Sequence, residues 1–324
     1  PQWTSRQASF PPSCIMQKVE KMITHLPDGA SYEMKSPGYM LDRALFDKEL
    51  VASAVLSGAR ISIGTKAVGL SPEELLVEHG GKKEIIRSRV FIGADGANST
   101  MARMAGQPSL SMITALQYEV ILPARQNHVD VYFHRDYEGG YGWLFPKGKT
   151  ANAGIGVSSS KASRLPALLR DFLDLLRRSG KLREVQIISK TGGLIPCAFY
   201  EKLLFKDVLL IGDAAGHAHP VTGAGTFNAV LGGEIAGRIA AEAIERGDLR
   251  YLENYEAEWH ETFGRFLSYG LLKRKFLEEH WNEPGVDFEG LIRKTWIGFK
   301  EYHADRRTIN LDPPLPAEEN VPLP

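Results

Sequence analysis

One segment, an apolar run followed by a glycine-rich turn and a long helix, constrains this chain more than any other. The aliphatic run Val208 to Ile211 predicts a buried strand. The turn GDAAGHAHPVTGAG follows it, and the Ala- and Gly-rich stretch Phe227 to Ile244 then predicts a helix suited to close packing. Because a buried strand that passes through a tight turn into a helix is the building unit of doubly wound sheets, we expect an α/β fold.

The same segment has the chemistry of a ligand site. Asp213 stands at the carboxyl end of the predicted strand, where its carboxylate could bind the hydroxyl groups of a polyol. Gly223 and Gly225 come just before the helix, whose first N–H groups have no partner within the helix and attract negative charge. A reduced flavin is anionic at one edge of its ring, so this order of residues suits a flavin. The alternative is a tight loop in which the glycines only provide positive φ angles.

A second turn, GADGANS, follows the apolar run Val90 to Gly93. Gly96 would let the backbone approach a phosphate-bearing ligand, and Asp95 could bind a sugar or orient nearby backbone amides. The alternative is an ordinary turn from a strand into a helix, since Asp and Gly are common turn residues.

A third feature is a row of aromatic residues. Tyr141, Trp143 and Phe145 alternate along one predicted strand, which places them on a single face. Such a face could form the wall of a long apolar cavity, or it could be the core of an antiparallel sheet, and the two interpretations are compatible.

The other elements follow from periodicity and turn signals. Amphipathic patterns predict helices over Leu45 to Leu56 and Pro166 to Arg178, and further helices between Leu249 and Lys300, before a proline-rich end over Leu311 to Pro324. A small strand cluster is expected from the runs Arg60–Ile63, Leu75–Glu78 and Arg87–Ala94. One antiparallel sheet is expected from four later runs, Ser111–Leu122, His128–His134, Tyr141–Phe145 and Asn152–Val157.

Composition narrows the class of protein. The 324 residues are 43% apolar and 24% charged, and 39 Lys and Arg balance 39 Asp and Glu, so no global charge favours nucleic acid. Two cysteines, Cys14 and Cys197, lie far apart without metal-like spacing, which indicates a reducing compartment and gives no reason to expect a metal site. No apolar run is long enough to span a bilayer, so we expect a cytoplasmic protein.

The turns GADGANS and GDAAGHAHPVTGAGTFNA resemble the two downstream FAD motifs of the group that includes aromatic hydroxylases and geranylgeranyl reductases. Arg43 with LFDKEL resembles that group's RxxFDxxL helix entry, although a local salt bridge is the alternative role for this arginine. The resemblance implies that Asp95 and Gly96 lie near the pyrophosphate, Asp213 at the ribityl chain and Gly223 to Gly225 beside the isoalloxazine. The implied FAD-binding residues are Arg43, Asp95, Gly96, Gly212, Asp213, Pro220, Gly223, Ala224, Gly225 and Asn228.

The aromatic row, with Gly154-Ile155-Gly156 after it, resembles the YxWxFP...GxG signature that lines the substrate cavity of geranylgeranyl reductases. The implied substrate-binding residues are Tyr141, Trp143, Phe145, Gly154 and Gly156. Many hydroxylases of the group have histidine where this chain has Gly216, which favours the reductase branch. The nearby His217 and His219 could donate a proton, but packing or loop roles are commoner for such residues, and no catalytic acid is assigned.

The resemblance implies an FAD-dependent oxidoreductase that reduces carbon–carbon double bonds of an isoprenoid or other apolar substrate. NAD(P)H or a reduced carrier would be the electron donor. The first alternative is a flavin monooxygenase that hydroxylates a small molecule or a protein-bound aromatic residue, and the second is a non-enzymatic interaction module. Peripheral membrane contact is a further hypothesis, because Phe263 to Trp281 mixes apolar and basic residues as an interfacial helix does, although a core helix is the commoner case.

The expected organisation is discontinuous. Residues 1–110 would hold the remainder of the FAD-binding domain with early strands of the substrate domain, 111–195 the substrate domain, 196–246 the second part of the FAD-binding domain, and 247–324 a helical region and tail. A strand, GxGxxG and helix should open such a domain. The first glycine here is Gly29 and no GxGxxG occurs. We therefore expect the native protein to be longer or this segment to come from another polypeptide.

Overall fold

The computed structural model describes residues 11–304, and its largest element is a seven-stranded sheet. The strand order is β11-β7-β10-β9-β8-β1-β2. The strands are β1 (Ile15–His25), β2 (Ser31–Leu41), β7 (Met112–Ile121), β8 (His128–Tyr132), β9 (Gly142–Lys147), β10 (Thr150–Ser158) and β11 (Ile187–Pro196). The four runs expected between Ser111 and Val157 are all strands of this sheet.

The four strands expected between Ser111 and Val157 pair antiparallel with one another, as predicted, but the whole sheet is mixed. Strand β1 pairs in parallel with β8, from Lys21 opposite His128 to His25 opposite Tyr132. The remaining neighbours in the sheet are antiparallel. Two strands from the N-terminal part of the chain have thus been added beside β8, and a parallel pair needs a long connection between its strands.

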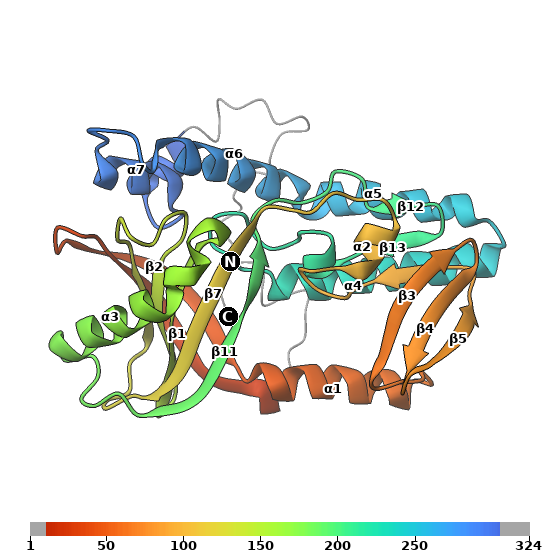
Figure 1. The fold of residues 1–324 in the computed structure, drawn as a ribbon, viewed down its shortest axis with the longest axis horizontal. Coiled ribbons are helices and arrows are strands. Elements are labelled where there is room, and N and C mark those ends of the chain that lie inside the picture. The colour runs from red at the N-terminus through yellow and green to blue at the C-terminus, as the bar shows by residue number, and fades with distance from the viewer. Residues whose placement is uncertain (1–10, 305–324) are drawn as a thin grey trace.

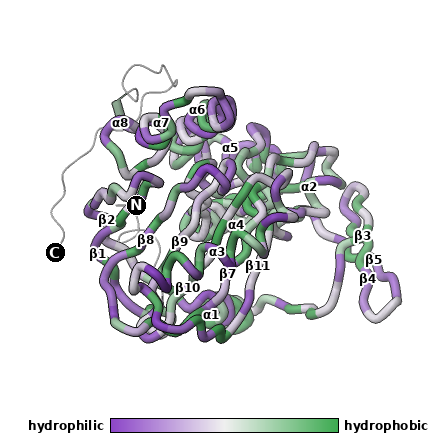
Figure 2. Tube along the Cα trace, turned by 60° about the vertical axis from the view of Figure 1, so that its left-hand side comes forward, coloured by the Kyte–Doolittle hydropathy of each residue, from purple (hydrophilic) through white to green (hydrophobic). Residues whose placement is uncertain are grey.

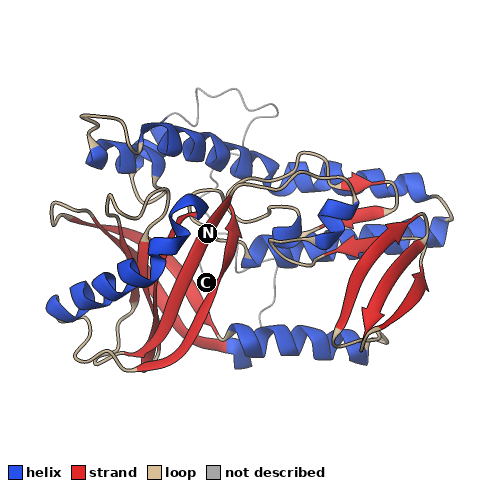
Figure 3. Cartoon of the chain, in the orientation of Figure 1, coloured by secondary structure: helices blue, strands red, loops and turns tan. Residues whose placement is uncertain are grey.

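Helix α3 (Leu165–Arg178) covers one face of the large sheet (Figure 3), as its amphipathic pattern predicted. Its apolar residues pack on alternate residues of β7, β9 and β10, and Phe172 lies at the centre of this core with Leu144 and Ile155. The buried positions of α3 are Leu165, Leu168, Leu169, Phe172, Leu173 and Leu176. The opposite face of the sheet is therefore the one that can meet other parts of the molecule.

On that opposite face, helices from the C-terminal region cover the end formed by β8, β1 and β2 (Figure 1). They are α6 (Arg265–His280), α7 (Phe288–Thr295) and α8 (Lys300–Ala304). Hydrophilic and hydrophobic residues both occur along α6 (Figure 2), and two of its basic residues, Lys273 and Arg274, are buried. Helix α6 is thus largely a core helix. Among the described helices, none is both long enough and apolar enough to cross a bilayer.

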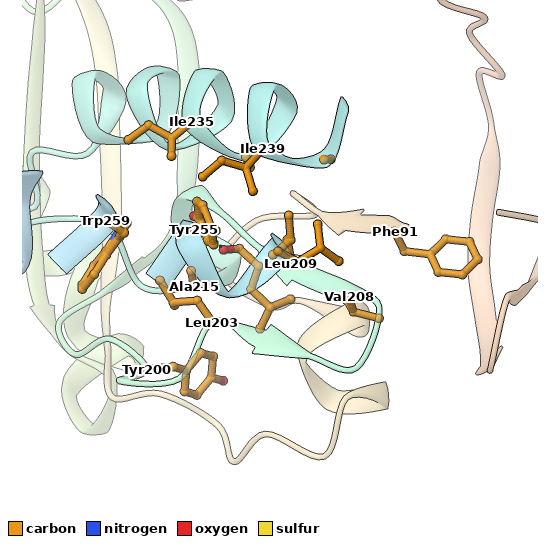
Figure 4. Close-up of a cluster of buried hydrophobic side chains, with 14 of the residues drawn as sticks. Phe91, Tyr200, Leu203, Val208, Leu209, Ala215, Ile235, Ile239, Tyr255 and Trp259 are labelled. Atoms are coloured by element: carbon orange, nitrogen blue, oxygen red, sulfur yellow. Dashed lines mark hydrogen bonds between the residues drawn. The ribbon is translucent and has the colours of Figure 1, made fainter. Parts of the chain in front are cut away.

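The second region is built around a three-stranded sheet with the order β12-β13-β6. Strand β13 (Val208–Leu210) pairs in parallel with β6 (Phe91–Gly93) and antiparallel with β12 (Leu204–Phe205). Helix α4 (Thr226–Arg246) covers the strands, with Ile235 and Ile239 directed toward Leu209 and the α5 residue Tyr255 (Figure 4). Two further helices, α2 (Thr100–Met104) and α5 (Asn254–Trp259), complete this α/β core.

A third sheet, β3 (Thr65–Ser71), β4 (Glu74–His79) and β5 (Lys82–Arg87), stands at the far end of α1 (Arg43–Leu56) (Figure 1). The helix expected over Leu45 to Leu56 is confirmed. The strand expected over Arg60–Ile63 was wrong, because this segment is irregular and Gly64, at φ 69°, turns the chain into β3. The run Arg87–Ala94 holds the end of β5 and all of β6 rather than one strand.

Candidate cofactor and substrate site

Asp213 lies just beyond the end of β13, in a one-turn 3₁₀ helix over Gly212–Ala214. The side chain is half-buried, and no hydrogen bond or ion pair within residues 11–304 engages its carboxylate. Burial raises the pKa of Asp213, and the positive charge of Arg43 acts against this rise. A partly desolvated acceptor without a donor is costly, so the carboxylate is suited to receive hydroxyl donors from a ligand.

Arg43, the first residue of α1, connects the two regions of the molecule. One guanidinium nitrogen donates to the Thr226 hydroxyl at the start of α4, at 3.0 Å. The other donates to Asp47 in the next turn of α1, at 3.3 Å. The arginine therefore makes the local salt bridge and also faces the turn that contains Asp213, and its contact with a cofactor stays a prediction.

The N-terminus of α4 is open. Gly225 is its N-cap, and no side chain caps the first N–H groups. A Cβ on Gly225 would lie 3.2 Å from the Ala218 Cα and 3.4 Å from an Asp213 carboxylate oxygen, so glycine keeps this approach close. Gly223 has a φ of 66°, in the region that favours glycine. Within residues 11–304, the start of α4 thus presents N–H groups without a side-chain partner beside Asp213, an arrangement that suits an anionic ligand edge.

Two buried histidines hold the turn that precedes α4. His217 Nδ1 accepts from the Gly212 amide at 3.1 Å, and the Asn228 side chain donates to the His217 carbonyl at 2.7 Å. His219 Nδ1 accepts from the Thr222 amide at 3.2 Å. Burial lowers the pKa of each ring to about 3, so both are neutral near pH 7. Their place in the structure is that of packing and loop residues.

The remaining predicted residues of this turn act through the backbone. Gly216 has a φ of 81°, and a Cβ there would overlap the Ala198 carbonyl and lie 2.6 Å from the Phe199 Cα, so no histidine side chain fits. Gly212 also has a positive φ, of 58°. The Ala224 carbonyl accepts from the His219 amide at 2.9 Å, and the ring of Pro220 packs against Gly270 of α6.

Asp95 and Gly96 lie beyond the end of β6, away from direct contact with Asp213. Both carboxylate oxygens of Asp95 are used within its own turn: they accept from the Thr100 amide at 2.6 Å, the Met101 amide at 3.1 Å and the Ser99 hydroxyl at 2.5 Å. Of the two roles foreseen for Asp95, the structure contains the orientation of backbone amides at the start of α2. Gly96 adopts a φ of 80°. A contact of either residue with a pyrophosphate stays a prediction.

The aromatic row reaches from the turn over Gly212–Gly225, called the cofactor turn below, into the large sheet. The Tyr141 hydroxyl donates to the Thr222 carbonyl at 2.5 Å, which joins the start of β9 to the turn before α4. The ring centres of Tyr141 and Trp143 are 5.9 Å apart, and those of Trp143 and Phe145 are 6.2 Å apart. The three rings thus form one continuous row, on the face of the sheet opposite α3, as the alternation along the strand indicated.

The structure explains the two glycines after the aromatic row and adds a residue that the sequence had not singled out. Gly154 pairs with Trp143 on β9 and with Gln117 on β7. The indole lies across Gly154, and its N–H donates to the Gln117 side-chain oxygen at 3.1 Å. A Cβ on Gly154 would overlap the indole, and one on Gly156 would lie 2.9 Å from Ile113. Gln117 could have been found only by its polarity within an apolar strand, because its partner depends on the register.

Three features together are those of an α/β fold with an FAD-type ligand site. They are a parallel strand pair, a carboxylate at one strand end without a donor in the described part of the chain, and the uncapped helix N-terminus beside it. A flavin-dependent brominase has the same fold, with a TM-score of 0.66 and 16% identity over 92% of this chain and 82% of that chain.

Sequence similarity identifies the family. A reductase named digeranylgeranylglycerophospholipid reductase 2 from Methanopyrus kandleri is 34% identical over 313 residues, which cover 86% of this chain and 76% of the relative. The digeranylgeranylglycerophospholipid reductase of Methanococcus aeolicus is 32% identical over 93% of this chain and 82% of its own length. The chain therefore belongs to the geranylgeranyl reductase family.

Two further comparisons agree with this assignment. The family model described as the geranylgeranyl reductase catalytic domain matches residues 111–195, which span β7 to β11. A solved structure of a geranylgeranyl bacteriochlorophyll reductase-like protein from Thermoplasma acidophilum has a TM-score of 0.78 and 27% identity, over 91% of this chain and 78% of that chain.

Proposed function

We propose that this protein is an FAD-dependent enzyme that reduces carbon–carbon double bonds in an isoprenoid lipid. The relatives are named as reductases of digeranylgeranylglycerophospholipid, and that substrate class is proposed for this chain. The observation that carries the proposal is the Tyr141–Thr222 hydrogen bond, which places an aromatic row directly against the turn suited to a flavin. An apolar chain lying along this row would reach the same place as the cofactor.

The residues around Asp213 would hold FAD. The Asp213 carboxylate would accept hydrogen bonds from the ribityl hydroxyls, and the open N-terminus of α4 would face the edge of the ring that becomes anionic. Arg43 would add a positive charge beside this edge. When bound, reduced FAD would supply a hydride to one carbon of the alkene, and the other carbon would take a proton from water or a nearby side chain.

The side chains of the aromatic row would position the substrate and exclude water. Trp143 is 9% exposed and is fixed by Gln117, so its ring presents a defined apolar surface. Burial raises the pKa of Tyr141, and its hydroxyl keeps its proton in the bond to Thr222. Tyr141 therefore acts in positioning. Reduced solvent access around the row favours transfer to an apolar bond over side reactions with water.

Anaerobic turnover tests the proposal. The flavin-loaded protein is reduced with dithionite, which replaces the physiological donor, proposed to be NAD(P)H or a reduced carrier. It is then incubated with digeranylgeranylglycerophospholipid, and the lipid is analysed by mass spectrometry. The expected products gain two mass units for each reduced double bond. Unchanged lipid, together with substrate-dependent oxygen consumption in air, would instead identify a monooxygenase.

We also propose that the protein contacts membranes peripherally through the outer face of α6. Leu272 and Phe276 are exposed there, 41% and 37%, and Lys275 lies between them. Apolar residues one helical turn apart with a cation beside them suit the boundary between head groups and acyl chains. Flotation with anionic liposomes at low salt should carry the protein upward, and Leu272→Glu with Phe276→Glu should leave it at the bottom. Equal flotation of the two proteins would contradict contact through α6.

A further inference from the structure

A groove of about 560 Å³ lies at one end of the large sheet, outside the site described above. It is formed where β1 begins and where the chain enters β8. Its six lining residues are Gln17, Lys18, Arg125, Gln126, Asn127 and His128. The lining contains two permanent cations and three amides but no carboxylate, which is the composition of a site for an anion.

Hydrogen bonds between the amides and their neighbours give the groove a fixed wall. The Gln17 side chain donates to the Gln126 carbonyl and accepts from the Gly148 amide, both at 2.7 Å. The Asn127 side chain donates to Glu20 at 2.9 Å. These bonds join β1, the entry to β8 and the turn after β9. The two segments that carry Lys18 and Arg125 are therefore held together by hydrogen bonds.

The two cations differ from other basic residues of the same sheet. Lys21 is paired with Glu33 at 2.6 Å. No carboxylate within residues 11–304 comes within 4.0 Å of the Lys18 or Arg125 charge, and both side chains are exposed. Their charge is therefore not neutralised within the described chain and is available to a ligand.

The acids and the histidine near the groove do not cancel this charge. Asp130 is fully buried below the groove, where it accepts from His25 at 2.8 Å and from Lys181 at 3.0 Å. Burial lowers the pKa of His128, which is thus neutral near pH 7. Glu20 is the acid beside the Asn127 wall. Two positive charges against one exposed negative charge leave the groove basic.

The groove lies at the end of the aromatic row that is remote from the cofactor turn. Strand β9 starts next to Tyr141, which contacts Thr222, and ends at Lys147. Gly148, which follows directly, donates to Gln17 in the groove wall. Six residues of extended strand, at about 3.4 Å each, separate the two ends by roughly 20 Å. A lipid whose chain lies along the row toward the flavin would thus place its polar end near the groove.

From this arrangement we infer that Lys18 and Arg125 bind the phosphate of the substrate's glycerophosphate head group, and that the groove therefore sets the direction in which the isoprenoid chain enters. The inference rests on the proposed reduction of an isoprenoid phospholipid. Beyond that reaction, the inference assigns a binding site for the head group and explains why the enzyme would prefer phosphorylated substrates. Guanidinium and ammonium groups are the usual partners of phosphate oxygens.

Charge reversal tests the inference. The double variant Lys18→Glu and Arg125→Glu is compared with Lys66→Glu and Lys83→Glu, two exposed lysines on the remote β3–β5 sheet. KM and kcat are measured with the phospholipid and with an isoprenoid alcohol of the same chain length. For the groove variant, KM for the phospholipid should rise at least about tenfold, because one lost charge-assisted hydrogen bond has that effect and both cations are removed, with kcat unchanged. KM for the alcohol should stay the same, and the control should match the wild type.

Titration calorimetry of the flavin-loaded protein with glycerol 1-phosphate gives a measurement that does not depend on turnover. The wild type should bind it, the groove variant should not, and free inorganic phosphate should compete for the same site. If the wild type reduces neither lipid but shows this pattern, the proposed reaction fails and the groove assignment stands. Equal KM changes for both lipids, or equal binding of glycerol 1-phosphate by both proteins, would overturn it. The assignment would also be overturned if the groove variant lost only its affinity for substrate-free anionic vesicles, because the groove would then contact a membrane surface.

Discussion

Glycine serves different purposes in the cofactor turn and in the aromatic row. In the turn over Gly212–Gly225, Gly212, Gly216 and Gly223 take positive φ angles, and Gly216 also lies against backbone atoms of Ala198 and Phe199. In the row, Gly154 has an ordinary strand conformation and leaves space for the indole of Trp143. The backbone beside Gly216 cannot give way to a new side chain, whereas the atoms nearest to Gly154 belong to the side chains of Trp143 and Gln117. The turn is therefore expected to be intolerant of change, and the row to be adjustable.

Gly216→Ala should have the largest effect. Alanine would bring both an unfavourable positive φ and an overlap with backbone, and we expect the free energy of unfolding to fall by about 3 kcal/mol or more. Urea unfolding followed by circular dichroism measures the change. Gly29→Ala, at a positive φ in open space, is the control for backbone strain alone and should cost about 1 kcal/mol. Equal losses in the two variants would show that the overlap at Gly216 is unimportant.

Mild acid should weaken the turn next. The pKa of His217 and His219 is lowered by burial to about 3, against an ordinary value of 6.5 in the unfolded chain. Between these values the unfolded state binds more protons, so stability is full above pH 6.5 and falls as the pH drops. At pH 5 the loss should be about 2 kcal/mol per ring.

Substitution of each histidine tests whether the two rings, and not other groups, cause the loss of stability in acid. His217→Gln and His219→Gln should each flatten the dependence of urea midpoint on pH between 7.5 and 5, although each will lower stability at pH 7.5. Gln117→Leu, in the aromatic row, should leave the slope unchanged. A slope that all three variants share with the wild type would assign the acid sensitivity to other groups.

Gly154→Ala should have a smaller effect than Gly216→Ala, because a side chain rather than backbone must move. We expect a loss of about 1 to 2 kcal/mol and a shift in the fluorescence of Trp143 as its bond to Gln117 is broken. The matched control is Gly193→Ala on β11, where a Cβ would meet nothing within 4 Å. It should change stability by less than about 0.5 kcal/mol. If the Gly154 and Gly193 variants have equal free energies of unfolding, the indole of Trp143 can accommodate the added methyl group without cost.

Asp213→Asn should change cofactor affinity and leave folding nearly unaffected. The carboxylate has no donor within the described chain and its pKa is raised by burial, so removing its charge costs the fold little. Flavin affinity should fall about tenfold, as when one hydrogen bond to a charged acceptor is lost. Flavin fluorescence quenching on titration gives this value. An unaltered affinity would place the ribityl chain elsewhere.

Local signals in the sequence predicted the helices and the turns. The spacing of Leu168, Phe172 and Leu176 was sufficient for α3, and the order of strand, turn and helix around Asp213 was sufficient for the central part of the site. Each of these patterns reflects burial along one element, so it can be read within a window of a few residues.

Features that depend on pairing between distant segments could not be predicted. The parallel contact of β1 with β8 and the bond from Trp143 to Gln117 both depend on register, which no single strand specifies. Arg60–Ile63 alternates as a strand does but pairs with no strand in the described part of the chain, and β3 forms after Gly64 instead. That Asp95 could orient backbone amides was foreseen, but which amides it accepts from, those of Thr100 and Met101 in α2, depends on the path of the turn.

The pairing of β6 with β13 has a consequence for how this protein is made. Phe91 lies opposite Val208, so synthesis must add 117 residues after Phe91 to reach its partner, and most of the large sheet is among them. At about 5 to 20 residues per second, β6 emerges from the ribosome roughly 6 to 23 seconds before β13. During that interval the substrate sheet can fold around α3 while β6 lacks this neighbour. Truncation upstream of Val208 should therefore release a folded substrate sheet joined to an unfinished cofactor region.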